Sequence, residues 1–240
     1  MAEGMQQEVL GIIGGMSWES TVTYYQEINR RYNARRGGHH SAPLLINSVD
    51  FAPIEAMQRS GDWSGTARIL IDAARALHRA GATVLLLATN TMHLVLDELA
   101  DAVALPWIHI ADATGEALAG AGIARVGLLG TRFTMEQPFY RDRLADRFGV
   151  EVVVPAEDDR RLVDEIIFSE LVHGHFTETS REHYREVMQR VAAAGADAVV
   201  FGCTEIGLLV GGEDSPVAVY DTTQLHAAAA VERLLSEGEE

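Results

Sequence analysis

Two polar triplets that could move protons occupy matching places in the sequence. Residues 89–91 (Thr-Asn-Thr) and residues 203–205 (Cys-Thr-Glu) each follow a short apolar run, which itself follows an Ala-Gly-Ala turn. Thr89 and Cys203, the only cysteine of the chain, are therefore in equivalent positions. A thiol has a reference pKa of about 8.5, and a helix N-terminus lowers it, so we expect Cys203 to supply a thiolate.

Two acid–base groups on opposite faces of one small molecule are what a racemase requires. One group removes a proton from a carbon atom, and the other returns a proton to the far face. A lone cysteine is more often a buried structural thiol. The position of Cys203 at the polar end of a strand, equivalent to that of Thr89, favours a catalytic role.

An internal duplication positions the two triplets. Residues 11–15 (Gly-Ile-Ile-Gly-Gly) and 127–131 (Gly-Leu-Leu-Gly-Thr) each end an apolar run and begin a helical pattern. These segments are 116 residues apart (127 minus 11), and the triplets are 114 residues apart (203 minus 89). The agreement predicts two similar α/β halves.

Short apolar runs alternate with helical patterns throughout both halves. Such alternation implies parallel sheets with right-handed crossovers, and ligands bind at the carboxyl ends of the strands. We therefore predict an active site in a cleft between two similar domains. The first domain is expected to comprise residues 1–114 and 216–240, and the second residues 115–215, with the last helix packed on the first half.

The net charge of the chain limits the classes of partner that it is expected to bind. The formal net charge is −16, whereas a nucleic-acid-binding surface needs clustered basic residues, so we expect no nucleic-acid partner. One basic cluster, residues 30–36, is interpreted as the solvated end of a helix that stops at Gly37 and Gly38.

Cysteine content and hydropathy indicate the compartment. A single cysteine allows no intramolecular disulfide, and the first residues lack the basic and apolar regions of a signal peptide. No apolar run approaches the roughly 20 residues that cross a bilayer. We therefore expect a cytoplasmic protein without a membrane partner.

Three motifs at this spacing resemble the aspartate/glutamate racemase family. They are Gly-Gly-Met-Ser-Trp-Glu-Ser (14–20), Thr-Asn-Thr-Met-His (89–93) and Phe-Gly-Cys-Thr-Glu-Ile (201–206). The similarity is greatest to the aspartate racemase and broad-specificity amino-acid racemase branch, and it covers nearly the whole chain. It implies a two-base mechanism without pyridoxal phosphate or another cofactor, an amino-acid substrate, two flavodoxin-like α/β domains and commonly a homodimer.

The resemblance also implies site residues by their positions in these motifs. Cys203 matches the second catalytic cysteine of the family, and Thr89 stands where most members have the first. Glu205 could orient the thiol or the substrate ammonium, or it could be a first-turn glutamate favoured by the helix dipole. The positions that match substrate-binding residues are Met16, Ser17, Asn90, Thr91, Thr131 and Thr204, together with Glu205.

Two departures from the family pattern affect the expected reaction. A threonine hydroxyl is a far weaker acid than a thiol, so Thr89 is expected to be the poorer partner of Cys203. Many aspartate racemases have an arginine where this chain has Val49, and that arginine meets the distal carboxylate of the substrate. The sequence does not tell which of three other arginines could replace it: Arg132, Arg160 or Arg161.

Other functions stay open at this point. A single cysteine opposite a group without a thiol resembles related decarboxylases and isomerases that protonate one face. A non-catalytic amino-acid-binding homologue is the other alternative. No metal site is expected, because His39 and His40 are adjacent and the chain has no His-x-x-x-His or Cys-x-x-Cys motif. His93 is either a helix residue bonded to a loop or a proton carrier, and Asp112 and Asp221 are either supports of the site or helix caps.

Overall fold

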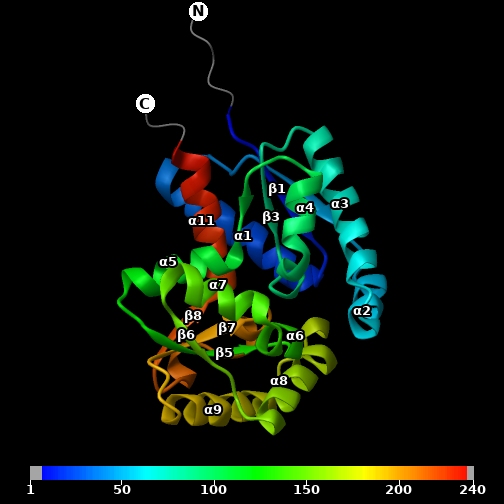
Figure 1. Cartoon of the computed structure of the whole chain (residues 1–240). Coiled ribbons are helices and arrows are strands. Elements are labelled where there is room, and N and C mark those ends of the chain that lie inside the picture. Colours follow the sequence, from blue (N-terminus) through cyan, green and yellow to red (C-terminus); the bar gives the residue numbers. More distant parts are fainter. Residues whose placement is uncertain (1–6, 237–240) are drawn as a thin grey trace, which may run out of the picture. The chain divides into compact units, whose positions relative to one another are not determined.

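The computed structural model describes residues 7–236 and contains two four-stranded parallel sheets (Figure 1). The strand orders are β2-β1-β3-β4 and β6-β5-β7-β8, and every pairing is parallel. This confirms the predicted α/β class with two similar parallel sheets. The strands are β1 Leu10–Gly14, β2 Leu44–Ser48, β3 Val84–Leu87, β4 Trp107–Ile108, β5 Arg125–Gly130, β6 Glu151–Val153, β7 Ala198–Gly202 and β8 Ala218–Asp221.

Helices connect the strands throughout the described chain. The longer ones are α1 Trp18–Arg36, α2 Phe51–Ser60, α3 Trp63–Arg79, α5 Ile110–Gly120, α7 Pro138–Phe148, α8 Glu157–Ser169, α9 Glu178–Ala193 and α11 Thr222–Ser236. The shorter ones are α4 Leu96–Ala102, α6 Arg132–Glu136, α10 Ile206–Leu209 and the 3-10 turns η1 Thr91–Val95, η2 Leu171–His173 and η3 Gly212–Asp214.

The central strands are apolar because both faces of each sheet are covered by helices. Strands β1, β3 and β7 are buried at every position. The predicted apolar stripe of α3 is buried at Ala67, Leu70, Ala74 and Leu77, which places this helix against the first sheet.

The chain forms two compact units whose boundaries differ from the expected domains. The first unit runs from the start of the described chain to Ala88 and includes Val95–His109 and the chain from His226 onward. The second comprises Thr89–Leu94 and Ile110–Leu225. Residues 216–225 fall in the second unit, not the first, because β8 pairs with β7.

Helices α5 and α11 each follow the last strand of one sheet but pack in the hydrophobic core of the unit that contains the other sheet. Ile110, Ala111 and Leu118 of α5 follow β4 of the first sheet, but they belong to the hydrophobic core of the second unit. Helix α11 follows β8 of the second sheet, and its buried residues, including Ala227 and Val231, belong to the core of the first unit. The prediction that the last helix packs on the first half is confirmed.

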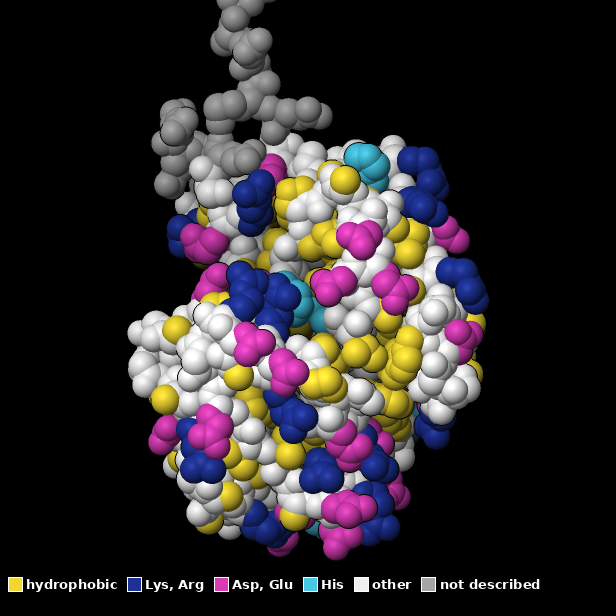
Figure 2. All heavy atoms as spheres, viewed as in Figure 1, with side chains coloured by type: hydrophobic (Ala, Val, Ile, Leu, Met, Phe, Trp, Pro, Cys, Tyr) yellow, Lys and Arg dark blue, Asp and Glu magenta, His cyan; other side chains and the backbone are white. Residues whose placement is uncertain are grey.

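Many basic residues on the surface form ion pairs with acidic residues. The space-filling view shows basic and acidic side chains next to one another on the visible face (Figure 2). In the predicted basic helix end, Arg31 pairs with Glu27 and Arg35 with Glu232, and α1 stops at Gly37 as expected. Within residues 7–236, no helix is long and apolar enough to cross a membrane.

Candidate active site

The structure brings most of the predicted site residues into one compact unit. Residues 89–91 follow β3, yet they cluster with the second unit, which also contains Thr131 and residues 203–205. Both triplets start just beyond the carboxyl ends of buried strands, where parallel sheets bind ligands. Met16 and Ser17 belong to the first unit, so their place beside the other residues stays a prediction.

Cys203 and Glu205 form a buried hydrogen-bonded pair. The thiol donates to Glu205 Oε2 at 2.9 Å, and the Thr204 hydroxyl donates to the same oxygen at 2.8 Å. Cys203 is 7% exposed, Glu205 2% and Thr204 4%. The two donations are those expected of an ionised carboxylate, so Glu205 is a potential acceptor for the thiol proton.

The electrostatic surroundings keep the Cys203 thiol protonated. Burial raises the pKa of Cys203 well above its ordinary value, and the Glu205 carboxylate raises it further. We expected a helix N-terminus to lower this pKa, and that expectation is wrong. Helix α10 starts only at Ile206 and has four residues, so its dipole is too short to offset burial and an adjacent negative charge.

Thr89 lies at the equivalent position without a carboxylate partner. The residue is 8% exposed, and within residues 7–236 its hydroxyl has no hydrogen-bond partner. Its carbonyl oxygen accepts a hydrogen bond from His93 Nδ1 at 2.8 Å. The hydroxyl of Thr89 is therefore available to a ligand, while its backbone is fixed.

His93 holds the backbone and is not placed to carry protons. The Ile110 N–H donates to His93 Nε2 at 3.2 Å, so the ring proton is on Nδ1, which donates to the carbonyl of Thr89. Residues 91–95 form a 3-10 turn, and the α-helix begins only at Leu96. The bonds from His93 to both neighbouring segments account for this tighter turn.

Asn90 offers an unused acceptor. Its Nδ2 donates to Thr222 Oγ1 at 3.0 Å, and that hydroxyl donates to the carbonyl of Phe201 at 2.7 Å. Asn90 is 3% exposed, and no group of residues 7–236 donates a hydrogen bond to its Oδ1. A buried carbonyl oxygen without a donor is costly, so this atom is suited to a ligand N–H group, such as an ammonium.

Three buried threonine hydroxyls meet beside this amide. Thr91 Oγ1 lies 3.0 Å from Thr131 Oγ1 and 3.4 Å from Thr134 Oγ1, and the latter two oxygens are 3.2 Å apart. Thr131 follows Gly130, which pairs in register with Gly202, the residue before Cys203. The hydroxyl cluster therefore lies one strand away from the thiol, within reach of the same small ligand.

The turn after β1 is the first-unit counterpart of the turn that holds Thr131. Ser17 caps α1 by accepting from the Ser20 N–H at 3.3 Å. Gly15 has φ +93°, and a Cβ there would lie 2.2 Å from the carbonyl oxygen of Val49, so only glycine is tolerated. Met16 and Ser17 are both buried, at 4% exposure each.

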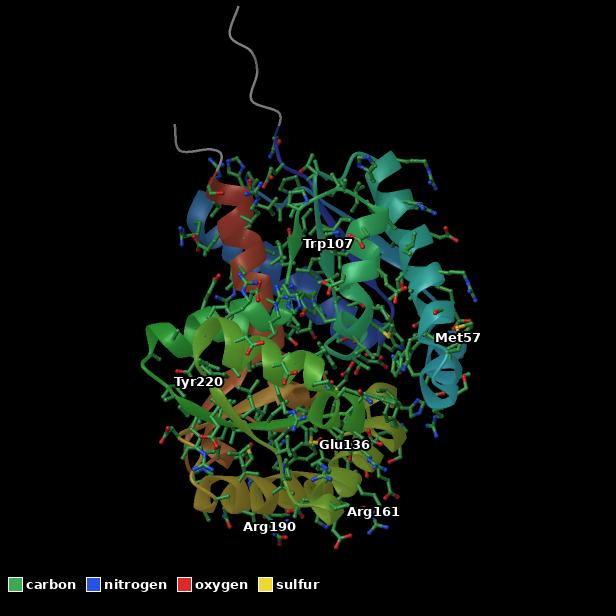
Figure 3. All side chains as sticks on the ribbon, in the orientation of Figure 1. Met57, Trp107, Glu136, Arg161, Arg190 and Tyr220 are labelled. Carbon is green, nitrogen blue, oxygen red and sulfur yellow. The ribbon has the colours of Figure 1, made fainter. Side chains whose placement is uncertain are left out.

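The arginines considered as substitutes for a guanidinium at position 49 are engaged elsewhere. Arg132 Nε and Arg160 Nε bind the same oxygen of Glu136 at 3.0 and 3.2 Å. The Arg132 hydrogen bond holds the pKa of Glu136 below its ordinary value, although burial opposes this. Arg161 is 72% exposed, pairs with Asp158, and points away from the unit (Figure 3).

The two aspartates at the strand exits have structural roles. Asp112 binds Arg143 through both carboxylate oxygens and tethers α5 to α7. Asp221 accepts the Thr223 N–H at 2.8 Å at the start of α11. The structure favours the cap interpretation for Asp221, whereas the tether made by Asp112 is neither of the two roles expected for it.

Three residues near the site were absent from the predicted set. Thr222 links Asn90 to β7, and Thr134 completes the hydroxyl cluster. Thr222 could have been found as a polar residue that follows a strand, as the predicted residues do, and Thr134 by its position three residues after Thr131. Tyr184 of α9 is fully buried, its hydroxyl has no hydrogen-bond partner among residues 7–236, and burial, together with nearby carboxylates such as Glu205, raises its pKa. No pattern in the sequence distinguishes Tyr184 from an ordinary core residue.

Comparisons with known proteins identify the family. The family model described as Asp/Glu/Hydantoin racemase matches residues 13–230, and the chain belongs to this family. The solved structure of a Yersinia pestis protein provisionally described as an Asp/Glu racemase is 50% identical, with 95% of this chain and 99% of that chain covered and a TM-score of 0.88. The predicted resemblance is confirmed.

Two further relatives extend the comparison. The structure of an aspartate racemase homologue from Pyrococcus horikoshii OT3 is 35% identical, covers 95% of this chain and 99% of that chain, and has a TM-score of 0.79. The broad specificity amino-acid racemase RacX of Bacillus subtilis (strain 168) is 23% identical over 235 residues, which are 95% of this chain and 99% of RacX. Racemase homologues of this kind imply an isomerase activity.

Proposed function

We propose that the protein is an amino-acid racemase that uses no pyridoxal phosphate and transfers protons through Cys203 and Thr89. The observation that carries the proposal is the buried 2.9 Å hydrogen bond from Cys203 to Glu205. Such a pair supplies the base that a thiol with a raised pKa needs. The motif resemblance matches Cys203 to a catalytic cysteine of the family.

The substrate is held by hydrogen-bond donors that face its carboxylate and an acceptor that faces its ammonium group. The hydroxyls of Thr91, Thr131 and Thr134 donate to the α-carboxylate, and Asn90 Oδ1, which has no protein donor, accepts from the ammonium group. Met16 and Ser17 contribute from the N-terminus of α1, where backbone N–H groups favour an anion.

Proton transfer begins at the thiol. Cys203 gives its proton to Glu205 Oε2, and the resulting thiolate takes the α-proton of the substrate. The electron pair of the broken C–H bond stays on the substrate and is delocalised into its carboxylate. The hydroxyl of Thr89 then donates a proton to the opposite face. The threonine recovers a proton from water, and Glu205 gives up the proton that it took from Cys203 to the resulting hydroxide, so the enzyme returns to its starting state.

The two directions differ in rate because the two groups differ in acidity. A hydroxyl cannot be stored as an anion at neutral pH, so removal of an α-proton by Thr89 is slow. Exchange at the face of Cys203 is therefore faster than inversion. This follows from the replacement of a thiol by threonine at position 89.

The substrate is aspartate, glutamate or a wider range of amino acids. Related proteins are described as Asp/Glu racemases and as a broad-specificity amino-acid racemase. Val49 offers no guanidinium to a distal carboxylate, and Arg132 and Arg160 already bind Glu136. A preference for acidic side chains therefore needs a rearrangement of these pairs, which favours broad specificity. Cytoplasmic residence, the remaining expectation about the cell, belongs to the same proposal.

Substitution of the thiol tests the proposal. Cys203→Ser is expected to lower α-proton exchange in deuterated water by about a thousandfold, since it removes an acid–base catalyst. Thr89→Cys should keep or raise inversion, because it restores a second thiol. Full turnover by Cys203→Ser, with circular dichroism and thermal midpoint unchanged, would contradict a catalytic role of this residue.

A decarboxylase is the second candidate, and one observation favours it. Burial and Glu205 keep Cys203 protonated, so the resting thiol is ready to protonate a carbanion on one face, which a decarboxylase requires. Release of carbon dioxide from a malonate-type acid, with no α-proton exchange on any amino acid, would support this candidate. Ligand-induced thermal stabilisation with neither reaction would instead identify a non-catalytic binder.

A further inference from the structure

Tyr184 of α9 has a buried hydroxyl that its neighbours leave without a hydrogen bond. Tyr24, Tyr140 and Tyr184 are all 0% exposed. The hydroxyl of Tyr24 bonds His226 Nδ1, and that of Tyr140 bonds Thr114 Oγ1. Among residues 7–236, no group bonds the hydroxyl of Tyr184. A buried polar group of this kind is costly and rare in folded proteins, so its presence requires an explanation.

The packing of α9 on the second sheet fixes the level of Tyr184. Helix α9 lies along β5 and β7 (Figure 1). A Cβ atom at Gly127 of β5 would lie 2.0 Å from Val191 Cγ1 of α9, so helix and strand touch at this point. Gly127 pairs in register with Val199 of β7. Val191 and Val199 therefore lie at the same level of the sheet.

From this level, helix and strand both lead to the carboxyl end of β7. Helix α9 ends at Ala193 and β7 begins at Ala198, so the two run in opposite directions. Tyr184 is seven residues before Val191 (191 minus 184), about 10 Å along the same face of the helix. Cys203 is four residues after Val199 (203 minus 199), about 13 Å along the strand. Helical side chains lean towards the helix N-terminus, so the Tyr184 hydroxyl extends towards the level of Cys203.

The thiol lies on the face of the sheet that α9 covers. Val199 is on this face, because its register partner Gly127 meets α9. Side chains alternate along a strand, so Phe201 and then Cys203 follow on the same face. Tyr184, Phe201 and Cys203 indeed belong to one hydrophobic core. The tyrosine hydroxyl and the thiol are therefore directed to the same buried region.

The surroundings of the Tyr184 hydroxyl keep it protonated. Burial raises the pKa of Tyr184 well above its ordinary value, and the acidic groups of Cys203, Glu205, Asp164 and Glu170 act in the same direction. Asp164 and Glu170 already accept hydrogen bonds from other residues. The sulfur of Cys203, in contrast, becomes a strong acceptor when it loses its proton.

We propose that Tyr184 stabilises the thiolate of Cys203 by donating a hydrogen bond from its hydroxyl to the sulfur. The inference rests on the proposed function, in which Glu205 takes the thiol proton. That transfer leaves a negative charge on a buried sulfur, which rotation about the Cα–Cβ bond of Cys203 brings to the hydroxyl. The hydroxyl keeps its own proton throughout. Tyr184 is thus a positioning residue that acts through Cys203.

The unpaired state of the hydroxyl is what makes it useful in this role. A donor that already had a partner would have to break that bond before it could serve the thiolate. The hydroxyl of Tyr184 has none to break, so it favours the charged state over the neutral resting state. The cost of burying it unpaired falls on the stability of the folded protein instead.

Tyr184→Phe tests the proposal, because it removes only the hydroxyl. Alkylation of Cys203 by iodoacetamide should slow about tenfold at each pH below the thiol pKa, since the thiolate is the form that reacts. Exchange of the α-proton should slow by a similar factor. The thermal midpoint should stay the same or rise, because the variant loses an unpaired buried group. An unchanged alkylation rate would overturn the proposal.

Tyr140→Phe is the matched control. Tyr140 is equally buried in the same unit, but its hydroxyl donates to Thr114 Oγ1. This variant should lower the thermal midpoint, because it removes a hydrogen bond that is made in the resting protein, and should leave the alkylation of Cys203 unchanged. Equal slowing of alkylation in the two variants would contradict a specific role of Tyr184.

Two further comparisons locate the acceptor and separate this proposal from the reaction itself. In the Glu205→Gln background, Tyr184→Phe should still slow alkylation about tenfold, since the hydroxyl serves the sulfur and not the carboxylate. Loss of the effect in that background would overturn donation to Cys203. Alkylation needs no substrate, so a slower Tyr184→Phe together with no α-proton exchange in the wild type would contradict the proposed function but support the role of Tyr184.

Discussion

The two halves of the chain share a framework and differ in their acid–base groups. Ser17 caps α1 with Ser20 three residues on, and Thr131 caps α6 with Thr134 at the same spacing. After β7, Cys203 is followed two residues later by Glu205, whose carboxylate accepts a hydrogen bond from the thiol. After β3, the same place holds Thr91, whose hydroxyl joins the threonine cluster instead. The framework therefore fixes where the groups lie, and a few side chains decide what they do.

A second pair of equivalent contacts differs in its response to pH. In the first unit, the Tyr24 hydroxyl bonds His226 Nδ1 at 2.9 Å. In the second unit, the Tyr140 hydroxyl bonds Thr114 Oγ1 at 3.2 Å. Tyr24 and Tyr140 are 116 residues apart (140 minus 24), the offset of the duplicated turns. One tyrosine is therefore held by an imidazole, which can titrate, and the other by a hydroxyl, which does not.

The largest expected effect is a loss of stability in acid through His226. Burial lowers the pKa of His226 to about 4, so the folded protein excludes a proton that the unfolded chain binds below pH 6.5. Stability should therefore fall by about 3 kcal/mol as the pH drops from 6.5 to 4. Urea unfolding at several pH values measures this loss.

His226→Gln is the matched variant for this effect. Glutamine can accept from Tyr24 and donate to the carbonyl of Ile108, the two partners of the imidazole, but it does not titrate. The free energy of unfolding of this variant should therefore lack the fall between pH 6.5 and 4 that His226 causes in the wild type. An identical acid profile in both proteins would show that His226 is not the source.

The next effect concerns the carboxylate beside the thiol. Glu205→Gln removes the proton acceptor of Cys203 and should slow α-proton exchange by about a hundredfold. It also removes a negative charge that raises the pKa of Cys203, so alkylation of the thiol by iodoacetamide should shift to lower pH. All labelling reports on Cys203, because the chain has no other cysteine. An unchanged alkylation profile would contradict the proposed coupling.

The smallest effect is expected at the hydroxyl cluster. Thr91→Val keeps the shape of the side chain but removes its hydroxyl, which should raise KM about tenfold through one lost hydrogen bond to the carboxylate, with little change in kcat. Thr66→Val is the control, since Thr66 is equally buried and bonds the carbonyl of Trp63 in α3. A tenfold rise in KM for both variants would indicate general destabilisation.

The fold was predictable because it depends on local patterns, and the same patterns selected the candidate site residues. Buried strands such as β3 appear as uninterrupted apolar runs, and residues 89–91 and 203–205 stand out as polar ends of such runs. The triplets and Thr131 indeed fall in one unit. The position of a cleft and the place of Met16 and Ser17 relative to Cys203 stay predictions.

Features set by distant contacts were missed. The 3-10 turn after Asn90 depends on bonds from His93 to Thr89 and to Ile110, seventeen residues away. The direction of the Cys203 pKa depends on how far the thiol is buried and on the Glu205 side chain folding back to it. Residues 216–225, expected in the first domain, cluster with the second unit, and the pairing of β8 with β7 that causes this is not visible in the composition of either strand.

The measurement that tests the central claim most directly compares α-proton exchange with inversion, starting separately from the L and D forms of one amino acid in deuterated water. We predict that one enantiomer, whose α-proton faces Cys203, exchanges with retention faster than it inverts. The other enantiomer should exchange slowly and mainly with inversion, because its proton faces Thr89. Equal rates of exchange and inversion from both enantiomers would contradict the asymmetry between the two halves.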